Sequence, residues 1–134
     1  MDLDQTMIVA GVGCRKGTSS REIGAAITAA LARAGLRRDA LDVIAAPAMK
    51  GGEAGIAGAA SDLGVPLVLV PQADLEAAGT RTMTRSERVI ALMGVPSAAE
   101  AAALAAAGPA ARLVAPRTAV GPATCALATS EVDG

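Results

Sequence analysis

Short apolar segments alternate along this chain with segments that carry helix signals. "TMIVAGV" (6–12), "LDVIAA" (41–46) and "VPLVLV" (65–70) have the length and the β-branched content of buried strands. A helix pattern follows each of them before the next strand signal begins. This order predicts a layered α/β domain, because a crossover helix returns the chain to the same sheet in a parallel direction.

The expected helices have recognisable ends. Ser19 with Glu22 has the spacing of a capping box, and apolar residues then recur at helical spacing until Gly35. Ser97 with Glu100 repeats this pattern. The further helices expected from the sequence cover residues 53–64, 72–79, about 85–93 and 97–107.

The end of the chain has a different pattern. "RLVAP" (112–116) and "ATCALATSE" (123–131) are two strand-like runs joined by the loop "RTAVGP" (117–122), which predicts an antiparallel hairpin. The fold class expected is therefore a three-layer αβα domain with a mostly parallel mixed sheet and a C-terminal antiparallel hairpin. We expect all 134 residues to form this one domain, with frayed ends at 1–5 and 130–134.

Composition excludes several classes of function. The chain has no Phe, Tyr or Trp, so it lacks the side chains on which single-stranded nucleic acid stacks, and its net charge of −1 argues against a general polyanion binder. It has no His, which excludes His-based triads and His metal ligands. We therefore expect no nucleic-acid partner, no metal and no cofactor.

The two cysteines and the chain's apolar stretches point to an intracellular protein. Cys14 and Cys125 lie far apart in the sequence and form no CxxC pair, and no secretory feature supports a disulfide between them. The N-terminus "MDLDQ" is acidic where a signal peptide is basic, and the longest low-polarity stretch is broken by Pro and Glu. These features predict a cytoplasmic location without a membrane partner.

The loop "GVGCRKGTSS" (11–20) combines glycines, cations and hydroxyls between the first strand and the first helix. Loops at the carboxyl end of parallel strands commonly bind ligands, and the next helix presents free N–H groups to an anion. The sequence order departs from both nucleotide-binding fingerprints. Two interpretations stay open, an anion site and an ordinary βα turn with two solvated cations. For an anion site the candidates are Gly13, Cys14, Arg15, Lys16, Gly17, Thr18 and Ser19.

The two lysines of the chain add a second observation. Lys16 follows the first expected strand, and Lys50, in "APAMKGGE", follows the second. Because the loops after parallel strands open at one edge of the sheet, both lysines are expected to face one cleft; the alternative is coincidence among twelve cations. Arg81, Arg85 and Ser86 follow the third strand and its helix and are expected at the same rim, or else they form a solvated helix start.

Several segments together resemble one known family. "GVGCRKGTS", "KGGEAG", "GVPLVLVPQADLEAAG", "SERVIALMGVPSAAEAAALAAAG" and "VAPRTAVGPATCALA" look like the CobE family, which is also the C-terminal domain of CbiG, both from cobalamin biosynthesis. The resemblance covers residues 6–129. One departure is Ala98, where the family usually has a bulkier Val.

The resemblance implies a three-layer α/β domain that works on corrin-ring intermediates. Such intermediates are large macrocycles fringed by carboxylates, which a cleft with a few cations, loop N–H groups and an Ala/Val/Leu-lined floor would suit. The expected function is binding or carrying a precorrin or hydrogenobyrinic-acid-type intermediate, with other cobalamin-pathway enzymes as further partners. Arg15, Lys16 and Lys50 would then pair with the carboxylates.

Two alternatives remain open. Full-length CbiG is similar to hydrolases that open the lactone of a cobalt-precorrin, and here Glu53 would serve as the base, with Cys14 as a nucleophile whose pKa is lowered by its cationic neighbours. Against this, a small buried residue at a strand end is the better explanation of Cys14. A scaffold that binds another enzyme through the Ala-rich segment 97–107 is the other alternative, and core packing is the simpler explanation of that segment.

Overall fold

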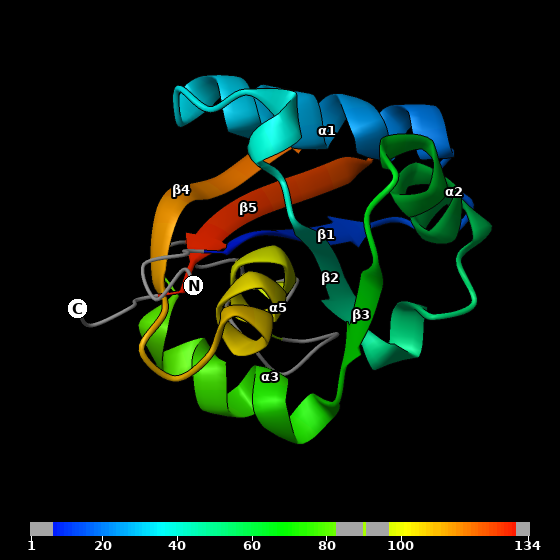
Figure 1. The fold of residues 1–134 in the computed structure, drawn as a ribbon. Helices are drawn as coiled ribbons and strands as arrows, with labels where there is room; N and C mark the ends of the chain where they lie inside the picture. The colour runs from blue at the N-terminus through cyan, green and yellow to red at the C-terminus, as the bar shows by residue number, and fades with distance from the viewer. Residues whose placement is uncertain (1–6, 83–89, 91–96, 131–134) are drawn as a thin grey trace.

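The computed structural model describes residues 7–82, 90 and 97–130 and confirms the predicted fold class (Figure 1). A five-stranded sheet has the order β3-β2-β1-β5-β4 and lies between two helical layers. The strands are β1 Ile8–Cys14, β2 Val43–Pro47, β3 Leu67–Val70, β4 Arg112–Val120 and β5 Ala123–Thr129. The helices are α1 Ser20–Arg33, α2 Ala54–Leu63, α3 Gln72–Ala78 and α5 Ala98–Ala107, with short 3₁₀ turns η1 Arg38–Ala40, η2 Ala48–Lys50 and η3 Gly79–Arg81.

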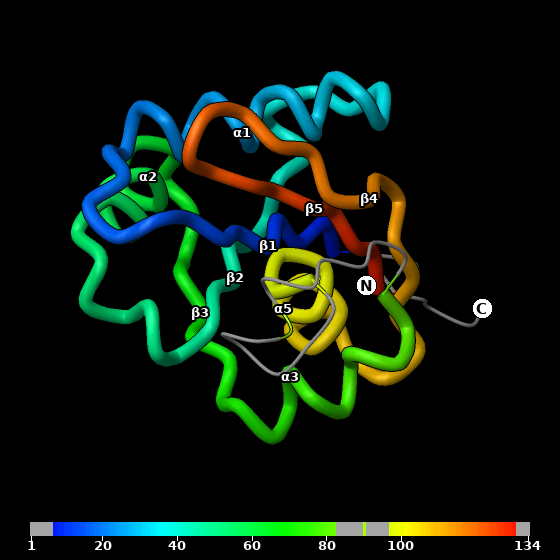
Figure 2. Tube along the Cα trace, turned by 180° about the vertical axis from the view of Figure 1, so that it is seen from behind, coloured from blue at the N-terminus to red at the C-terminus, as the bar shows by residue number. Residues whose placement is uncertain are grey.

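The sheet is mixed in the way that the sequence predicts. β1, β2 and β3 pair in parallel, whereas β5 pairs antiparallel with both β1 and β4. Only β5 therefore runs against the other four strands. Helices α1 and α2 cover one face, and α3 and α5 cover the other, as the view from behind also shows (Figure 2).

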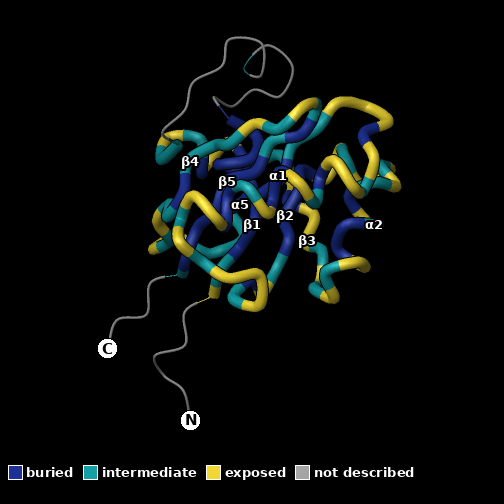
Figure 3. Tube along the Cα trace, turned by 90° about the horizontal axis from the view of Figure 1, so that it is seen from above, coloured by how far each residue is buried: buried dark blue, intermediate teal, exposed yellow. Residues whose placement is uncertain are grey.

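Side chains of alternate residues in β1 pack into the two layers of the core on opposite faces of the sheet. Ala10 and Val12 pack with Ile23 on the α1 side, whereas Val9 packs with Leu104 on the α5 side. Strands β1, β2 and β5 are consequently largely buried, whereas the edge strands β3 and β4 and the outer faces of the helices are more exposed (Figure 3). No helix within the described ranges is both long enough and apolar enough to cross a membrane.

Helix α5 lies so close to β1 that only glycine is accommodated between them. A Cβ on Gly11 would overlap the carbonyl oxygen of Ala99 and lie 2.6 Å from the backbone nitrogen of Ala103. Residues 98–104 of this Ala-rich helix are all buried, so core packing is the correct interpretation of the segment. Small side chains on the helix and no side chain on the strand permit the contact.

The N-terminus of α5 differs from the expected capping box. The Ser97 hydroxyl accepts a hydrogen bond from the Glu100 N–H at 3.3 Å, as predicted, but the Glu100 carboxylate accepts from the Arg117 N–H at 2.8 Å. This buried carboxylate therefore links α5 to β4. The expected helix near 85–93 lies outside the described residues, apart from residue 90, which is helical.

Two boundaries are wrong in the sequence prediction. Strand β1 continues to Cys14, so Gly13 and Cys14 belong to the strand and not to the loop. Strand β4 continues to Val120, so the hairpin turn is Gly121–Pro122 and not the six residues 117–122. As an edge strand, β4 tolerates the proline at position 116 together with two register shifts. The loop-like composition of residues 117–120 therefore does not end the strand.

We expect Gly11→Ala to destabilise the protein. The added methyl group must displace backbone atoms of α5, and overpacking of this kind lowers the free energy of unfolding by about 1–3 kcal/mol. Urea denaturation measures this change.

Gly24→Ala in α1 is the matched control, because nothing lies within 4 Å of a Cβ added there. Within a helix this change raises stability by about 0.5–1 kcal/mol. Equal effects of the two substitutions would contradict the close approach of α5 to β1.

Candidate functional site

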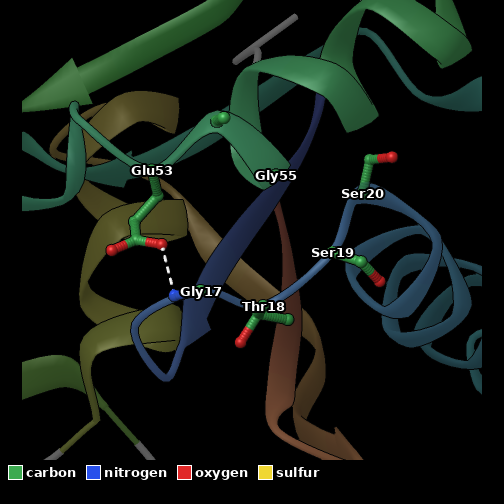
Figure 4. A pocket seen from close by; sticks show the side chains of 7 residues that line it. Gly17, Thr18, Ser19, Ser20, Glu53 and Gly55 are labelled. Carbon is green, nitrogen blue, oxygen red and sulfur yellow. Dashed lines mark hydrogen bonds between the residues drawn. The ribbon is translucent and has the colours of Figure 1, made fainter.

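The loop after β1 and the connection after β2 lie side by side at one end of the sheet (Figures 1 and 2). The Gly17 N–H donates a hydrogen bond to Glu53 Oε1 at 2.9 Å and joins the two segments (Figure 4). Gly17 has a φ of 82°, a left-handed conformation that favours glycine. The predicted common edge for the two loops is therefore present, as the parallel pairing of β1 with β2 requires.

The start of α2 packs directly against the first loop. A Cβ on Gly55 would overlap the carbonyl oxygen of Thr18 and lie 3.1 Å from the Ser19 carbonyl carbon. The two helix starts therefore border one pocket of about 360 Å³. Its lining residues are Gly17, Thr18, Ser19, Ser20, Glu53, Ala54 and Gly55.

The pocket differs from the expected cleft in its lining. Glycine, serine and threonine predominate, and the expected floor of Ala, Val and Leu is therefore wrong. None of Arg15, Lys16 and Lys50 lines it. Arg15 and Lys16 lie exposed in the turn between Cys14 and Gly17, and Lys50 ends the 3₁₀ turn three residues before Glu53.

The three cations carry uncompensated positive charge. No ion pair joins Arg15, Lys16 or Lys50 to a carboxylate within residues 7–82, 90 and 97–130. Lys50 acts electrostatically on the Cys14 thiol, as does Glu53, which places both charges near the end of β1. The two segments that border the pocket therefore carry three cations, here called the cationic rim, and Glu53 is the one carboxylate in the lining.

The two predicted hydroxyl donors are already used within the chain. The Thr18 hydroxyl donates to the Arg15 carbonyl at 2.6 Å. Ser19 forms the predicted capping box: its hydroxyl accepts from the Glu22 N–H at 3.1 Å, and the Glu22 carboxylate accepts from the Ser19 N–H at 3.0 Å. These side chains shape the loop, and we assign them no ligand contact.

Cys14 has a raised pKa, which overturns the predicted activation. Burial raises the pKa of this thiol, the Lys50 ammonium lowers it, the Glu53 carboxylate raises it, and a hydrogen bond with Thr18 lowers it. Burial prevails over the Lys50 charge because the strand holds the thiol partly inside the α1-side core. Cys125 is fully buried, its pKa is also raised by burial, and both cysteines are free thiols.

Gly13 and Arg15 are tied to the C-terminal hairpin. The Thr124 hydroxyl donates to the Gly13 carbonyl at 3.3 Å, and the Arg15 N–H donates to the Pro122 carbonyl at 3.1 Å. The hairpin turn therefore flanks the loop that carries the first two cations.

Arg81 lies away from the predicted rim. Its guanidinium donates to the carbonyl oxygens of Gly108, Pro109 and Ala111, at the end of α5. Arg112, which follows Ala111, pairs with Thr129, and Thr129 pairs with Ile8, the first residue of β1. Arg81 therefore lies at the end of the sheet where β1 begins, away from the loop that follows β1. Arg85 and Ser86 lie outside the described residues.

Ser20, Ala54 and Gly55 line the pocket and were missed as site residues. A signal for Gly55 was present, because it is the last residue of the segment "KGGEAG", which contributes to the family resemblance. Its place in the helix expected over residues 53–64 gave no further indication of a site. No group of three His, Cys, Asp or Glu side chains that could hold a metal forms within the described ranges.

The comparisons with known proteins identify the family of this chain. The family described as "Cobalamin synthesis G C-terminus" matches residues 8–128. The chain belongs to the CobE/CbiG C-terminal family. It is therefore a protein of cobalamin biosynthesis, as the resemblance implies.

Three similar proteins match this chain over most of their own length. Protein CobE from Sinorhizobium sp is 36% identical over 121 residues, which cover 90% of this chain and 79% of that protein. The crystal structure of CobE has a TM-score of 0.89 at 30% identity, over 96% of this chain and 94% of that one. Cobalamin biosynthesis protein chiG from Agrobacterium tumefaciens has a TM-score of 0.73 at 48% identity, over 91% and 97%.

We expect Gly55→Ala to disrupt the pocket of this CobE/CbiG domain. The methyl group must push α2 away from Thr18, which lengthens or breaks the Gly17–Glu53 hydrogen bond and lowers stability by about 1–3 kcal/mol. Thermal unfolding and amide exchange at Gly17 measure the two effects. Gly52→Ala, where a Cβ meets nothing within 4 Å, should leave both unchanged; a similar loss there would contradict the proposed contact.

The raised pKa of Cys14 predicts slow alkylation near neutral pH. A raised pKa leaves less thiolate at a given pH, so the iodoacetamide rate should increase only as the pH rises above the ordinary thiol range. Lys50→Ala removes the charge that lowers the pKa and should slow the reaction, whereas Glu53→Gln should accelerate it. Mass spectrometry of the alkylated protein assigns the modified cysteine. Equal rates in both variants would show that neither charge reaches the thiol.

Proposed function

We propose that this chain binds a corrinoid intermediate of cobalamin biosynthesis without covalent chemistry, at the edge where β1 and β2 end. The observation that carries the proposal is the Gly17–Glu53 hydrogen bond of 2.9 Å, because it brings the two lysine-bearing loops together. Arg15, Lys16 and Lys50 then belong to the two segments that border one pocket. Corrin intermediates carry carboxylate side chains, which are suitable partners for such a group of cations.

The size of the pocket determines how such a ligand would lie. About 360 Å³ is near the lower limit for drug-sized ligands, and a corrin macrocycle with its side chains is larger. We therefore place one peripheral side chain in the pocket and the macrocycle outside it, across the cationic rim. Exposed Met49, which precedes Lys50, offers apolar surface next to that rim.

The lactone hydrolase alternative has weaker support. Its nucleophile would need an accessible thiolate, and burial raises the pKa of Cys14. Its base would be Glu53, whose carboxylate instead accepts the Gly17 N–H. Non-covalent binding needs neither a thiolate at Cys14 nor a free base at Glu53.

We expect hydrogenobyrinic acid to change its visible spectrum when titrated with the purified protein. Lys16→Ala and Lys50→Ala should each weaken binding by about two- to fivefold, which corresponds to one solvent-exposed ion pair, and the double variant should lose more. Higher salt should weaken binding of the wild type more than that of the double variant.

Arg38→Ala is the matched control. Arg38 is exposed in η1, which precedes β2 and therefore lies at the opposite edge of the sheet. The substitution removes one positive charge, as each lysine substitution does, and should leave the affinity for hydrogenobyrinic acid nearly unchanged. The proposal fails if the spectrum does not change, or if the lysine variants bind as tightly as the Arg38 control.

A further inference from the structure

We infer that Glu53 makes the pocket select an uncharged amide group over a carboxylate on the ligand side chain that enters it. This inference rests on the proposed function and concerns the same site. Glu53 is the only ionisable side chain among the seven residues that line the pocket. Its carboxylate points across the pocket to Gly17, as Figure 4 shows.

One oxygen of Glu53 is engaged and the other is available. Oε1 accepts the Gly17 N–H at 2.9 Å, whereas Oε2 accepts no hydrogen bond from the part of the chain that the structure describes. A carboxylate accepts hydrogen bonds at both oxygens, so Oε2 is an acceptor for a ligand. Because Gly17 fixes the position of the carboxylate, this acceptor stays in the pocket.

The start of helix α2 supplies a donor beside Glu53. This helix has no side-chain cap, and its first N–H, on Ala54, has no acceptor within the described residues. The Ser20 hydroxyl also lines the pocket, but it points away from Glu53 in Figure 4. The pocket thus combines one negatively charged acceptor with a neutral donor.

This combination is complementary to a primary amide. The NH₂ group of an amide donates to Glu53 Oε2 while its carbonyl oxygen accepts from the Ala54 N–H. A carboxylate at the same place has no proton to donate, and its negative charge is repelled by that of Glu53. Sites that hydrogen-bond a particular group discriminate strongly against an analogue that lacks it.

The cationic rim has the opposite preference, which defines the ligand further. Arg15, Lys16 and Lys50 lie outside the pocket and attract carboxylates there. The best ligand therefore carries carboxylates where it crosses the rim and one amide where it enters the pocket. Its chemical class is a partly amidated corrinoid, which an amide-forming reaction on a carboxylate side chain must supply.

Two probes test this inference, hydrogenobyrinic acid and a partly amidated form of it. Dissociation constants are measured by visible spectroscopy for the wild type, Glu53→Gln and Asp62→Asn, in about 0.5 M salt to screen the rim. Asp62→Asn is the matched control, because it removes a negative charge from the exposed end of the same helix. Glutamine keeps an acceptor for the Gly17 N–H and adds an NH₂ group that binds a carboxylate.

The expected result is a wild-type preference for the amidated probe of about tenfold, the ratio that 1.4 kcal/mol produces. Glu53→Gln should abolish or reverse this preference, and Asp62→Asn should retain it. An unchanged ratio in Glu53→Gln overturns the inference. So does a wild type that binds the acid as tightly as the amide, and this comparison stands even if the variant does not fold.

The two proposals fail in different ways. If the wild type binds both probes with equal affinity, the corrinoid function stands and the role of Glu53 is refuted. If it binds neither probe even at low salt, where the rim is not screened, the proposed function itself is refuted, and the inference with it.

Discussion

The backbone of α5 rests directly on β1, and the arrangement of the domain depends on this contact. A side chain at Gly11 would overlap backbone atoms of α5, and the helix presents mainly alanines to the sheet. Attraction between many closely spaced atoms here replaces the large aromatic fillers that the composition lacks. With α5 fixed on one face, α1 and α2 are left to the other face, where they meet at the carboxyl ends of β1 and β2.

The candidate site is a product of that second layer. Gly55 allows α2 to touch the loop that precedes α1, just as Gly11 allows α5 to touch β1. The Glu53 carboxylate then reaches Gly17 and holds the loops together. The contact between Gly55 and Thr18 thus positions the starts of α1 and α2. The cations lie in the two loops because they directly precede these helix starts in the sequence.

Much of the fold could be predicted from the sequence, because the strand–helix alternation and the Ser19–Glu22 cap are local signals. The boundaries at Cys14 and Val120 could not, because they depend on pairing with β5 and on the tolerance of an edge strand for Pro116. Of the site, the common edge for Lys16 and Lys50 followed from parallel pairing. The pKa of Cys14, the position of Arg81 and the small polar lining did not, since burial and helix contacts across the chain decide them.

The single reversed strand has a consequence for the two ends of the domain. β5 runs against β1, so Thr129 pairs with Ile8, and the Met7 N–H reaches the Ser130 hydroxyl at 2.9 Å. The chain therefore enters and leaves the sheet at one margin, with Cys14 and the pocket at the other. A polypeptide attached at either end of the described segment would therefore leave the pocket open.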